Sequence, residues 1–529
     1  MHAGVARSAY HSWKFDPVNP SIYEGPEPDS LMLPPLDEVL PIVDHYFYTF
    51  NTVIPLFHQP VFMKVLHTWY NQPQSRDRAT WAAIQIVMAL GYRTPQLALG
   101  EAQMKHIERA DVCLRNAQTV VSELVTRDQD LLGVQILLGI VMLFQNSRDP
   151  KPASVIIGTA VRLAHRLQLH SSNAGELFPA IEAEQRSRVF WIAYTLDKDI
   201  CLRATTPSCQ FDDDVDIPLP SLAPEDSAGL IWTQNGQVHF NYHRRRVELA
   251  YIEGKVYDLL YSNRASKVRG PERKRRVLRL QNMLDQWYER IPSVFHIDNV
   301  AAAVGPSQLV QMTKMHHAFL LAEVMTHGIY SHNADWVQRI SSFSRAAIGD
   351  WNPGYGSPKC GMKDQEPPLP DGWTKCVDIS RGCMKLFQEA TPTECLVCCS
   401  HFSALIIILA NMTLNPGHKF IHVDQHLSVK ALDLFDKLLG IIEDASFRSL
   451  RAIVGELSQK AEAAVESYRQ ELSRSGRDIF DTLNVDNSGD AQPDLDTEVD
   501  FDALNFDPTG AGNMEILDNG MADLISFMR

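Results

Sequence analysis

Apolar residues recur at positions i, i+3, i+4 and i+7 through most of this 529-residue chain, and this spacing constrains the fold more than any other feature. It places apolar side chains on one face of an α-helix. Alternation with a period of two residues, which is typical of half-buried strands, is nearly absent. The chain is therefore predicted to be all-α. The periodic segments are residues 36–50, 79–92, 101–124, 128–145, 153–170, 247–262, 272–291, 376–387, 394–411, 425–442 and 449–473.

Composition divides the chain into three parts. Residues 1–30 hold several prolines and few periodic apolar positions, which predicts an extended arm. Residues 31–475 are predicted to form one large, bundle-like multi-helix domain, with a Pro- and Gly-rich surface loop at 351–373. Residues 476–529 have too little continuous apolar surface to fold alone, and we expect them to be disordered.

The charge is concentrated at the C-terminus. From Asp478 onward thirteen Asp and Glu oppose one Arg, a balance of −12 that leaves −3 of the total −15 for residues 1–477. Neither part has the broad basic surface of a protein that binds nucleic acid through phosphates. Any DNA contact is expected to be local or to come from a segment outside these residues.

The tail alternates acidic with bulky apolar residues, a composition typical of activation segments. A purely solubilising tail is the alternative. The apolar residues that would contact a partner are Phe480, Leu483, Phe501, Leu504, Phe506, Leu524 and Phe527.

Cysteine usage and hydropathy bear on the compartment. The nine cysteines form no regularly spaced framework, and the first residues lack the apolar core of a secretory signal. Both features indicate a reducing, intracellular compartment. The longest apolar run, residues 395–410, is shorter than a membrane span, so we predict a buried helix there and no membrane contact.

The segment from Arg186 to Pro220 combines charged and aromatic residues on one predicted helix, followed by a proline-flanked acidic loop. More than half of the helix circumference is apolar, which predicts a central position in the bundle. Arg186 and Asp197 share a face but lie about 16 Å apart along the axis, so each needs a partner on a neighbouring element. We predict an architectural role, because no nucleophile or second acid within reach suggests catalysis.

The acidic loop that follows resembles a calcium-binding loop only in part. Acidic residues fall at its first, third and fifth positions, but Ile217 stands where glycine is required and Ala223 where the final glutamate is required. We therefore predict a solvated connector with a helix-capping role, in which prolines prevent the helix from continuing. Its acidic residues are Asp212, Asp213, Asp214 and Asp216.

This segment closely resembles the signature of the fungal-specific transcription factor regulatory domain, the middle homology region of zinc binuclear cluster regulators. Segments 55–62, 158–170, 249–257 and 284–292 resemble further blocks of that domain in the expected order, and together the matches cover roughly residues 36–300. One departure is Thr205-Thr206-Pro207 where the family usually has Gly-Arg-Pro. The signature residues, predicted to be structural, are Arg186, Arg188, Phe190, Trp191, Tyr194, Asp197, Pro207, Pro218 and Pro220.

The resemblance implies a regulator of RNA polymerase II transcription that acts in the nucleus on a metabolic or biosynthetic gene set. It also implies recruitment of the transcription machinery by the acidic tail, and pairing with itself or with other family members. The family's DNA-binding module, six cysteines holding two zinc ions, is not found in this sequence. We therefore expect no cofactor in this chain, and DNA contact only through a module outside it or on a partner.

Two local patterns have competing interpretations. Part of a zinc cluster has the same spacing as four cysteines of this chain, Cys376, Cys383, Cys395 and Cys398. The basic residues that would contact phosphates in such a cluster are absent. We therefore favour the alternative, in which these cysteines pack as small apolar side chains. The basic run Arg273-Lys274-Arg275-Arg276 is a candidate nuclear-import signal, although it also opens an amphipathic helix and fits an ordinary solvated face.

Three functions from different classes remain open. The favoured one is a transcription factor. The second is a co-regulator that binds no DNA and pairs with a complete zinc cluster factor. The third is an α-helical small-molecule binder or enzyme, although the G-x-S-x-G, P-loop, H-E-x-x-H and post-strand G-x-G-x-x-G motifs are missing, and we predict that the chain is not an enzyme. The adjacent His316 and His317 lack an acidic partner at metal-ligand spacing, so a surface or core position is predicted for them.

Overall fold

The computed structural model describes residues 31–94, 101–126, 130–145, 151–329, 370–389, 398–439 and 445–485. The predicted arm (1–30), most of the predicted loop (351–369 of 351–373) and the chain beyond Val485 lie outside the described residues. Within them the fold is all-α apart from one two-stranded hairpin, as the periodicity predicts.

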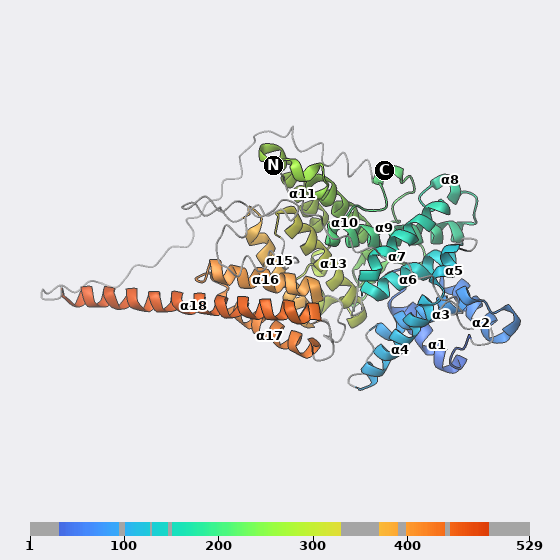
Figure 1. The fold of residues 1–529 in the computed structure, drawn as a ribbon, viewed down its shortest axis with the longest axis horizontal. Coiled ribbons are helices and arrows are strands. Elements are labelled where there is room, and N and C mark those ends of the chain that lie inside the picture. The colour runs from blue at the N-terminus through green and yellow to red at the C-terminus, as the bar shows by residue number, and fades with distance from the viewer. Residues whose placement is uncertain are drawn as a thin grey trace, which may run out of the picture.

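The first half of the molecule is a packed set of helices (Figure 1). The apolar helix α6 lies at its centre, and every residue from Gly133 to Phe144 is buried. The elements are α1 (Leu36–Thr49), α2 (Gln59–Asn71), η3 (Pro73–Ser75), α3 (Arg78–Arg93), α4 (Glu101–Gln118), α5 (Val121–Thr126), α6 (Leu131–Gln145), α7 (Lys151–Arg166), α8 (Ser172–Gly175), α9 (Ala180–Ala204) and η4 (Asp212–Asp214).

The second half begins with the hairpin, in which Ile231 pairs antiparallel with Phe240. Its elements are β1 (Leu230–Trp232), β2 (His239–Asn241), α10 (Tyr242–Val256), η5 (Tyr257–Tyr261), η6 (Ala265–Lys267), α11 (Gly270–Glu289), η7 (Ser293–Phe295), α12 (Val300–Ala303), α13 (Pro306–Thr326), α15 (Trp373–Glu389), α16 (Cys398–Leu414), α17 (Ile421–Leu439) and α18 (Ala445–Val485). Helix α18 extends beyond the body of the molecule as a single long helix (Figure 1).

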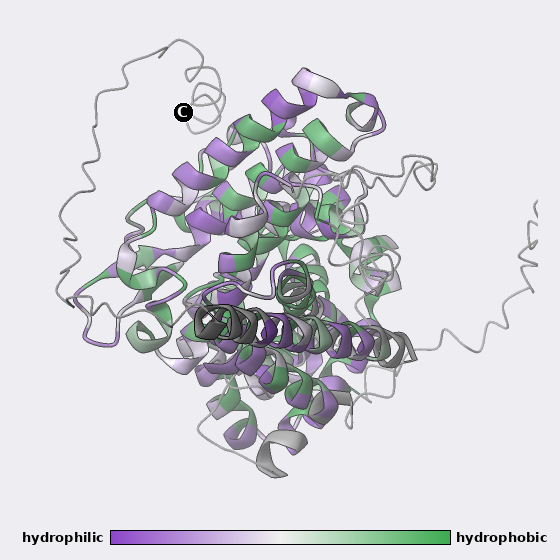
Figure 2. Ribbon diagram, turned by 90° about the vertical axis from the view of Figure 1, so that its left-hand side faces the viewer, coloured by the Kyte–Doolittle hydropathy of each residue, from purple (hydrophilic) through white to green (hydrophobic). Residues whose placement is uncertain are grey.

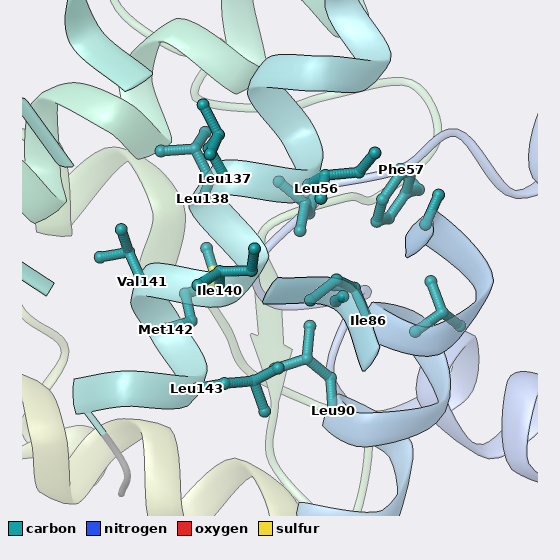
Figure 3. Close-up of a cluster of buried hydrophobic side chains, with 14 of the residues drawn as sticks. Leu56, Phe57, Ile86, Leu90, Leu137, Leu138, Ile140, Val141, Met142 and Leu143 are labelled. Atoms are coloured by element: carbon teal, nitrogen blue, oxygen red, sulfur yellow. The ribbon is translucent and has the colours of Figure 1, made fainter. Parts of the chain in front are cut away.

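Buried apolar side chains form two cores. The first joins the segment around Leu56 and Phe57 to α3 and α6, where Ile86 and Ile140 contribute (Figure 3). A Cβ at Gly139 of α6 would collide with the Ile86 side chain, so this close helix approach requires glycine. The second core lies among α10, α11, α13, α15, α16 and α18.

Helices α9 and α10 belong to both cores. Leu202 of α9 packs in the second core, whereas Val247 and Ala250 of α10 pack in the first. Green and purple stretches alternate along the helices in Figure 2, as expected for elements with one apolar face. The α9–α10 pair therefore connects the two halves through shared apolar contacts.

Several predicted boundaries were wrong. Residues 101–124, predicted as one helix, form α4 and α5 with a break between them, and the predicted helix 247–262 ends in the π-helical turn η5. The predicted loop 351–373 ends early, because Trp373 starts α15 and is buried. Helix α18 passes the predicted domain end at residue 475 and reaches Val485. Gly476 does not stop it, since a glycine inside a helix costs only about 1 kcal/mol.

Candidate regulatory site around helix α9

Helix α9 is buried along most of its length, as its apolar circumference predicts. Phe190, Trp191 and Tyr194 are each 1% exposed. The Trp191 ring lies edge-on to both neighbours, with ring centroids 5.2 Å from Phe190 and 5.4 Å from Tyr194. These aromatic side chains supply the contact area that holds α9 at the centre of the molecule.

The two charges expected to need partners are buried and have them. Arg186 donates from Nη2 to the carbonyl oxygen of Leu167 at 2.7 Å, and its guanidinium carbon lies 3.9 Å from the ring centroid of Phe178. Asp197 is 0% exposed. Its carboxylate accepts hydrogen bonds from Ser208 Oγ at 2.5 Å and from the backbone N–H of Cys209 at 2.9 Å. Asp197 thus fixes the start of the loop that follows α9.

Arg188 ties α9 to the segment before the hairpin. Its two terminal nitrogens donate to the Asp226 carboxylate at 2.7 and 2.8 Å, and Nε donates to Glu184 at 3.0 Å. This two-point geometry suits a planar guanidinium and not a lysine ammonium. Burial alone would raise the pKa of Asp226, but the Arg188 hydrogen bonds hold it below its ordinary value.

The prediction that Asp212 is solvated was wrong. Its side chain is 7% exposed and pairs with Lys198 at 2.9 Å and Lys255 at 3.1 Å. It also accepts a hydrogen bond from the Tyr194 hydroxyl at 2.8 Å. Burial alone would raise the pKa of Asp212, but the two lysines lower it. The overlooked signal was Lys198, which lies in the buried central part of α9 and therefore needs an acidic partner.

The other acidic residues of the loop match the prediction more closely. Asp213 and Asp214 are exposed. Asp216 caps the short helix α8, because its carboxylate accepts from the backbone N–H of Ser172 at 2.7 Å.

The three signature prolines hold the loop against α9 and α10 through their carbonyl oxygens. Pro207 accepts from Cys201 Sγ at 3.4 Å, Pro218 from Trp191 Nε1 at 3.0 Å and Pro220 from Arg244 Nη1 at 2.7 Å. From the sequence, Pro218 and Pro220 were predicted to stop the helix and Pro207 only to be a structural signature residue. The carbonyl contacts were not predicted, because they do not depend on which side chain is present.

A second buried charge network lies between α9 and α10. Glu253 is 0% exposed, and its Oε1 lies 3.7 Å from Arg246 Nη1. Burial and, to a smaller extent, the nearby carboxylate of Asp199 raise the pKa of Glu253 to about 8, against the opposing charge of Arg246. Asp199 in turn contacts Arg203, at 3.4 Å. None of these residues was predicted from the sequence to be buried.

The predicted import signal lies on α11, where its side chains differ in exposure. Lys274 and Arg275 are exposed, whereas Arg273 and Arg276 are half-buried. Arg276 donates to Glu272 at 3.0 Å and to the carbonyl oxygen of Leu259 at 3.1 Å.

The cysteine and histidine patterns lie in the second core. Cys376 and Cys383 are buried on α15, where burial raises the pKa of each thiol. Cys395 lies outside the described residues, as does the side chain of Cys398. His316 and His317 are both buried, and burial lowers the pKa of His316 to about 4. Within the described part of the chain, no three His, Cys, Asp or Glu side chains gather closely enough to hold a metal ion.

The predicted activation residues lie largely beyond the described structure. Phe480 and Leu483 fall on the last turns of α18, where the backbone alone is described. The other five lie outside the described residues. In the described part of the chain, no helix combines the length and apolar character needed to span a bilayer.

This chain is similar to one known domain family and to several named proteins. Residues 43–289 match the fungal specific transcription factor domain. An ABC-transporter-regulating transcription factor of Aspergillus oryzae is 30% identical over 443 residues, covering 83% of this chain and 48% of the relative. The Fusaridione A cluster transcription factor of Fusarium heterosporum is 30% identical over 235 residues, 44% of each chain. This chain spans about half the length of these relatives.

Among solved structures, a chain of the K. lactis CBF3 core is similar, with a TM-score of 0.43, 14% identity and coverage of 85% of this chain and 90% of the other. This similarity is too distant to support a functional conclusion. The match at 43–289 contains α9 and both charge networks, and it falls within the region whose motifs carry the resemblance. Residues 43–289 of this chain are a fungal specific transcription factor domain.

Proposed function

We propose that this chain is part of a fungal regulator of RNA polymerase II transcription that controls a metabolic or biosynthetic gene set and acts in the nucleus. The observation that carries the proposal is the fungal specific transcription factor domain at 43–289, folded around a buried α9. Relatives named as regulators of ABC transporters and of the Fusaridione A cluster support the choice of gene set.

The helical body and the tail have separate roles in this proposal. The body senses a signal or packs against a partner. It carries out no catalysis, because its central charged side chains form ion pairs and hydrogen bonds with one another and with the backbone. The acidic tail recruits the transcription machinery through its apolar residues. DNA contact comes from a module outside these residues or on a paired family member, so the chain itself needs no cofactor.

A reporter experiment tests the activating role. The full chain is fused to an unrelated DNA-binding module placed upstream of a reporter gene. We expect activation by the natural sequence and its loss in a variant with Phe501→Ser, Leu504→Ser and Phe506→Ser. This variant is a matched control, because it keeps every tail charge and leaves the described fold untouched. A silent reporter with the natural sequence, at normal protein level, would contradict the role.

Nuclear import is tested separately on α11. Lys274→Ala and Arg275→Ala together change only exposed side chains, so the fold should survive. We expect the fluorescently tagged double variant to accumulate in the cytoplasm, whereas Lys64→Ala with Lys430→Ala, also at exposed sites, should not move the protein. Equal nuclear signal from both variants would remove the import assignment.

A further inference from the structure

A strongly basic surface lies on the outer side of α11 and the turn before it. From Arg264 to Arg279 the chain carries eight Lys and Arg and a single acid, Glu272, a balance of +7. The body as a whole is close to neutral, with −3 for residues 1–477. Figure 1 shows α11 at the upper edge of the molecule. The segment that carries this excess of positive charge therefore lies at the periphery of the fold.

Two of the exposed cations lie beside an exposed apolar side chain. Lys274 and Leu278 are four residues apart and so lie on one face of α11. Leu278 is 60% exposed, and the Arg275 side chain is 76% exposed. Lys267, on the 3-10 turn η6 before the helix, is also exposed. We call Lys267, Lys274, Arg275 and Leu278 the α11 basic surface.

Little of the charge on Lys267, Lys274 and Arg275 is neutralised by neighbouring acidic side chains. Within the part of the chain that the structure describes, no acidic side chain forms an ion pair with Lys267 or Lys274. Arg275 contacts Glu272 at 2.6 Å, but Glu272 is shared with Arg276 at 3.0 Å. One carboxylate thus serves two guanidinium groups, and the surface keeps a net positive field.

We propose that the C-terminal tail of this same chain, residues 486–529, docks on the α11 basic surface. The tail carries eleven Asp and Glu against one Arg, a balance of −10. Its acids alternate with bulky apolar residues, among them Phe501 and Phe506. Cations beside an exposed leucine complement a segment of this kind in both charge and apolar contact.

The covalent connection favours the tail over a free acidic peptide. The 44 residues beyond Val485 reach at most about 145 Å when fully extended, longer than a domain of this size is wide. The covalent tether also holds the tail at an effective concentration on the order of millimolar, so even weak contacts form within one chain.

Duplex DNA is a rival occupant, but the surface fits it less well. Phosphates would neutralise Lys267, Lys274 and Arg275 equally well. They would leave Leu278 without an apolar contact, whereas an acidic segment with aromatic residues covers it. Docking of the tail on this surface does not depend on whether the tail also activates transcription.

Carbodiimide cross-linking of the full chain tests the docking, because this reagent joins a lysine amine directly to a carboxylate in contact with it. Mass spectrometry then identifies each linked pair. We expect tail carboxylates to link to Lys267 and Lys274 with at least about tenfold the yield of links to Lys64 and Lys430, exposed lysines on α2 and α17. Mixing isotope-labelled and unlabelled chains should show that the links form within one chain.

Two variants that keep both lysines provide matched controls. Arg275→Glu adds a repelling charge and Leu278→Ser removes the apolar contact, and each is expected to reduce the links to Lys267 and Lys274 several-fold. Salt at about 1 M, where the Debye length is roughly 3 Å, should do the same. Yields that are equal at all four lysines, or that are unchanged by both variants and by salt, would overturn the proposal.

A third outcome assigns the surface to nucleic acid. If a short DNA duplex protects Lys267 and Lys274 from modification while no tail link forms, the docking proposal fails. The reporter experiment separates this inference from the proposed function. A chain that forms the links but activates no reporter contradicts only the activating role, and a chain that activates without links contradicts only the docking.

Discussion

At the scale of single residues, Thr205 ends α9 in a strained conformation. Its φ of 54° and ψ of 40° lie in the left-handed region, which a β-branched side chain rarely adopts. This is also where the chain departs from the family's usual glycine. We expect Thr205→Gly to stabilise the protein by about 0.5–1 kcal/mol, because relief of strain exceeds the entropy that glycine adds to the unfolded chain.

Chemical denaturation of the full chain measures this change. The preceding residue provides the control, since Ala204 is exposed and helical. Ala204→Gly should destabilise by about 0.5–1 kcal/mol. If both glycine variants lose stability, Thr205 carries no strain that glycine can relieve.

The buried Glu253 makes the stability of the protein depend on pH. Its pKa of about 8 in the folded protein lies above the ordinary 4.5, so between these values the folded state binds more protons than the unfolded state. This group therefore makes the free energy of unfolding fall as pH rises from about 4.5 to about 8. Glu253→Gln removes the titration and should stabilise the protein by about 1–3 kcal/mol at pH 9.

Urea unfolding between pH 5 and pH 9 checks this expectation. The Glu253→Gln curve should be flatter than that of the natural protein, whereas Glu289→Gln, at an exposed site on α11, should run parallel to it. Parallel curves for all three proteins would show that Glu253 is ionised throughout this range.

At the scale of elements, the loop after α9 is held by the buried contact of Asp212 with Lys198 and Lys255. Asp212→Asn leaves two lysines around a neutral side chain, and one of them, Lys198, is 3% exposed. We expect a loss of about 3 kcal/mol, because breaking a buried ion pair strands its partner charge. Because the pKa of Asp212 is lowered, its contribution is present above the ordinary value of 3.8 and is lost as pH falls through the folded pKa.

The neighbouring Asp213 tests whether position or charge matters. Asp213 is exposed on the same turn, so Asp213→Asn removes the same charge and should leave the unfolding midpoint unchanged. Equal effects of the two variants would mean that the Asp212 contacts contribute nothing beyond net charge.

The elements themselves were largely predictable. Helical spacing identified α1, α3, α6, α7 and α11 to within a few residues, since one buried face imposes its period on the sequence. The hairpin was missed, because strands of three residues are too short to show alternation. Asp212 was wrongly predicted to be solvated because a run of acidic residues is typical of an exposed loop. Its two lysine partners lie on α9 and α10, and only the fold brings them close to Asp212.

The same limit appears in the charges of the site. A lone arginine or aspartate in an apolar helix predicts a buried partner, and this reasoning anticipated the environments of Arg186 and Asp197. It could not name the partners, since Leu167 and Ser208 contribute groups with no distinctive pattern. Glu253 was overlooked because its helix carries several charges, and only packing shows which of them is buried.

At the scale of the whole molecule, the two cores share α9 and α10, and this sharing predicts how the protein unfolds. Leu202 of α9 is fully buried and packs in the second core, whereas most of the buried residues of α9 pack in the first. Leu202→Ala should cost about 2–5 kcal/mol. Because α9 cannot leave one core without exposing the other, both halves should lose that stability together.

Hydrogen exchange of the full chain distinguishes joint from separate opening. In Leu202→Ala we expect the amides of α3, in the first core, and of α16, in the second, to exchange faster by the same factor. Leu405→Ala, in α16 and far from α9 in sequence, should do likewise if the molecule opens as one unit. Faster exchange in α16 with unchanged exchange in α3 would instead show two bodies that unfold independently, and the α9–α10 pair would then transmit no stability between them.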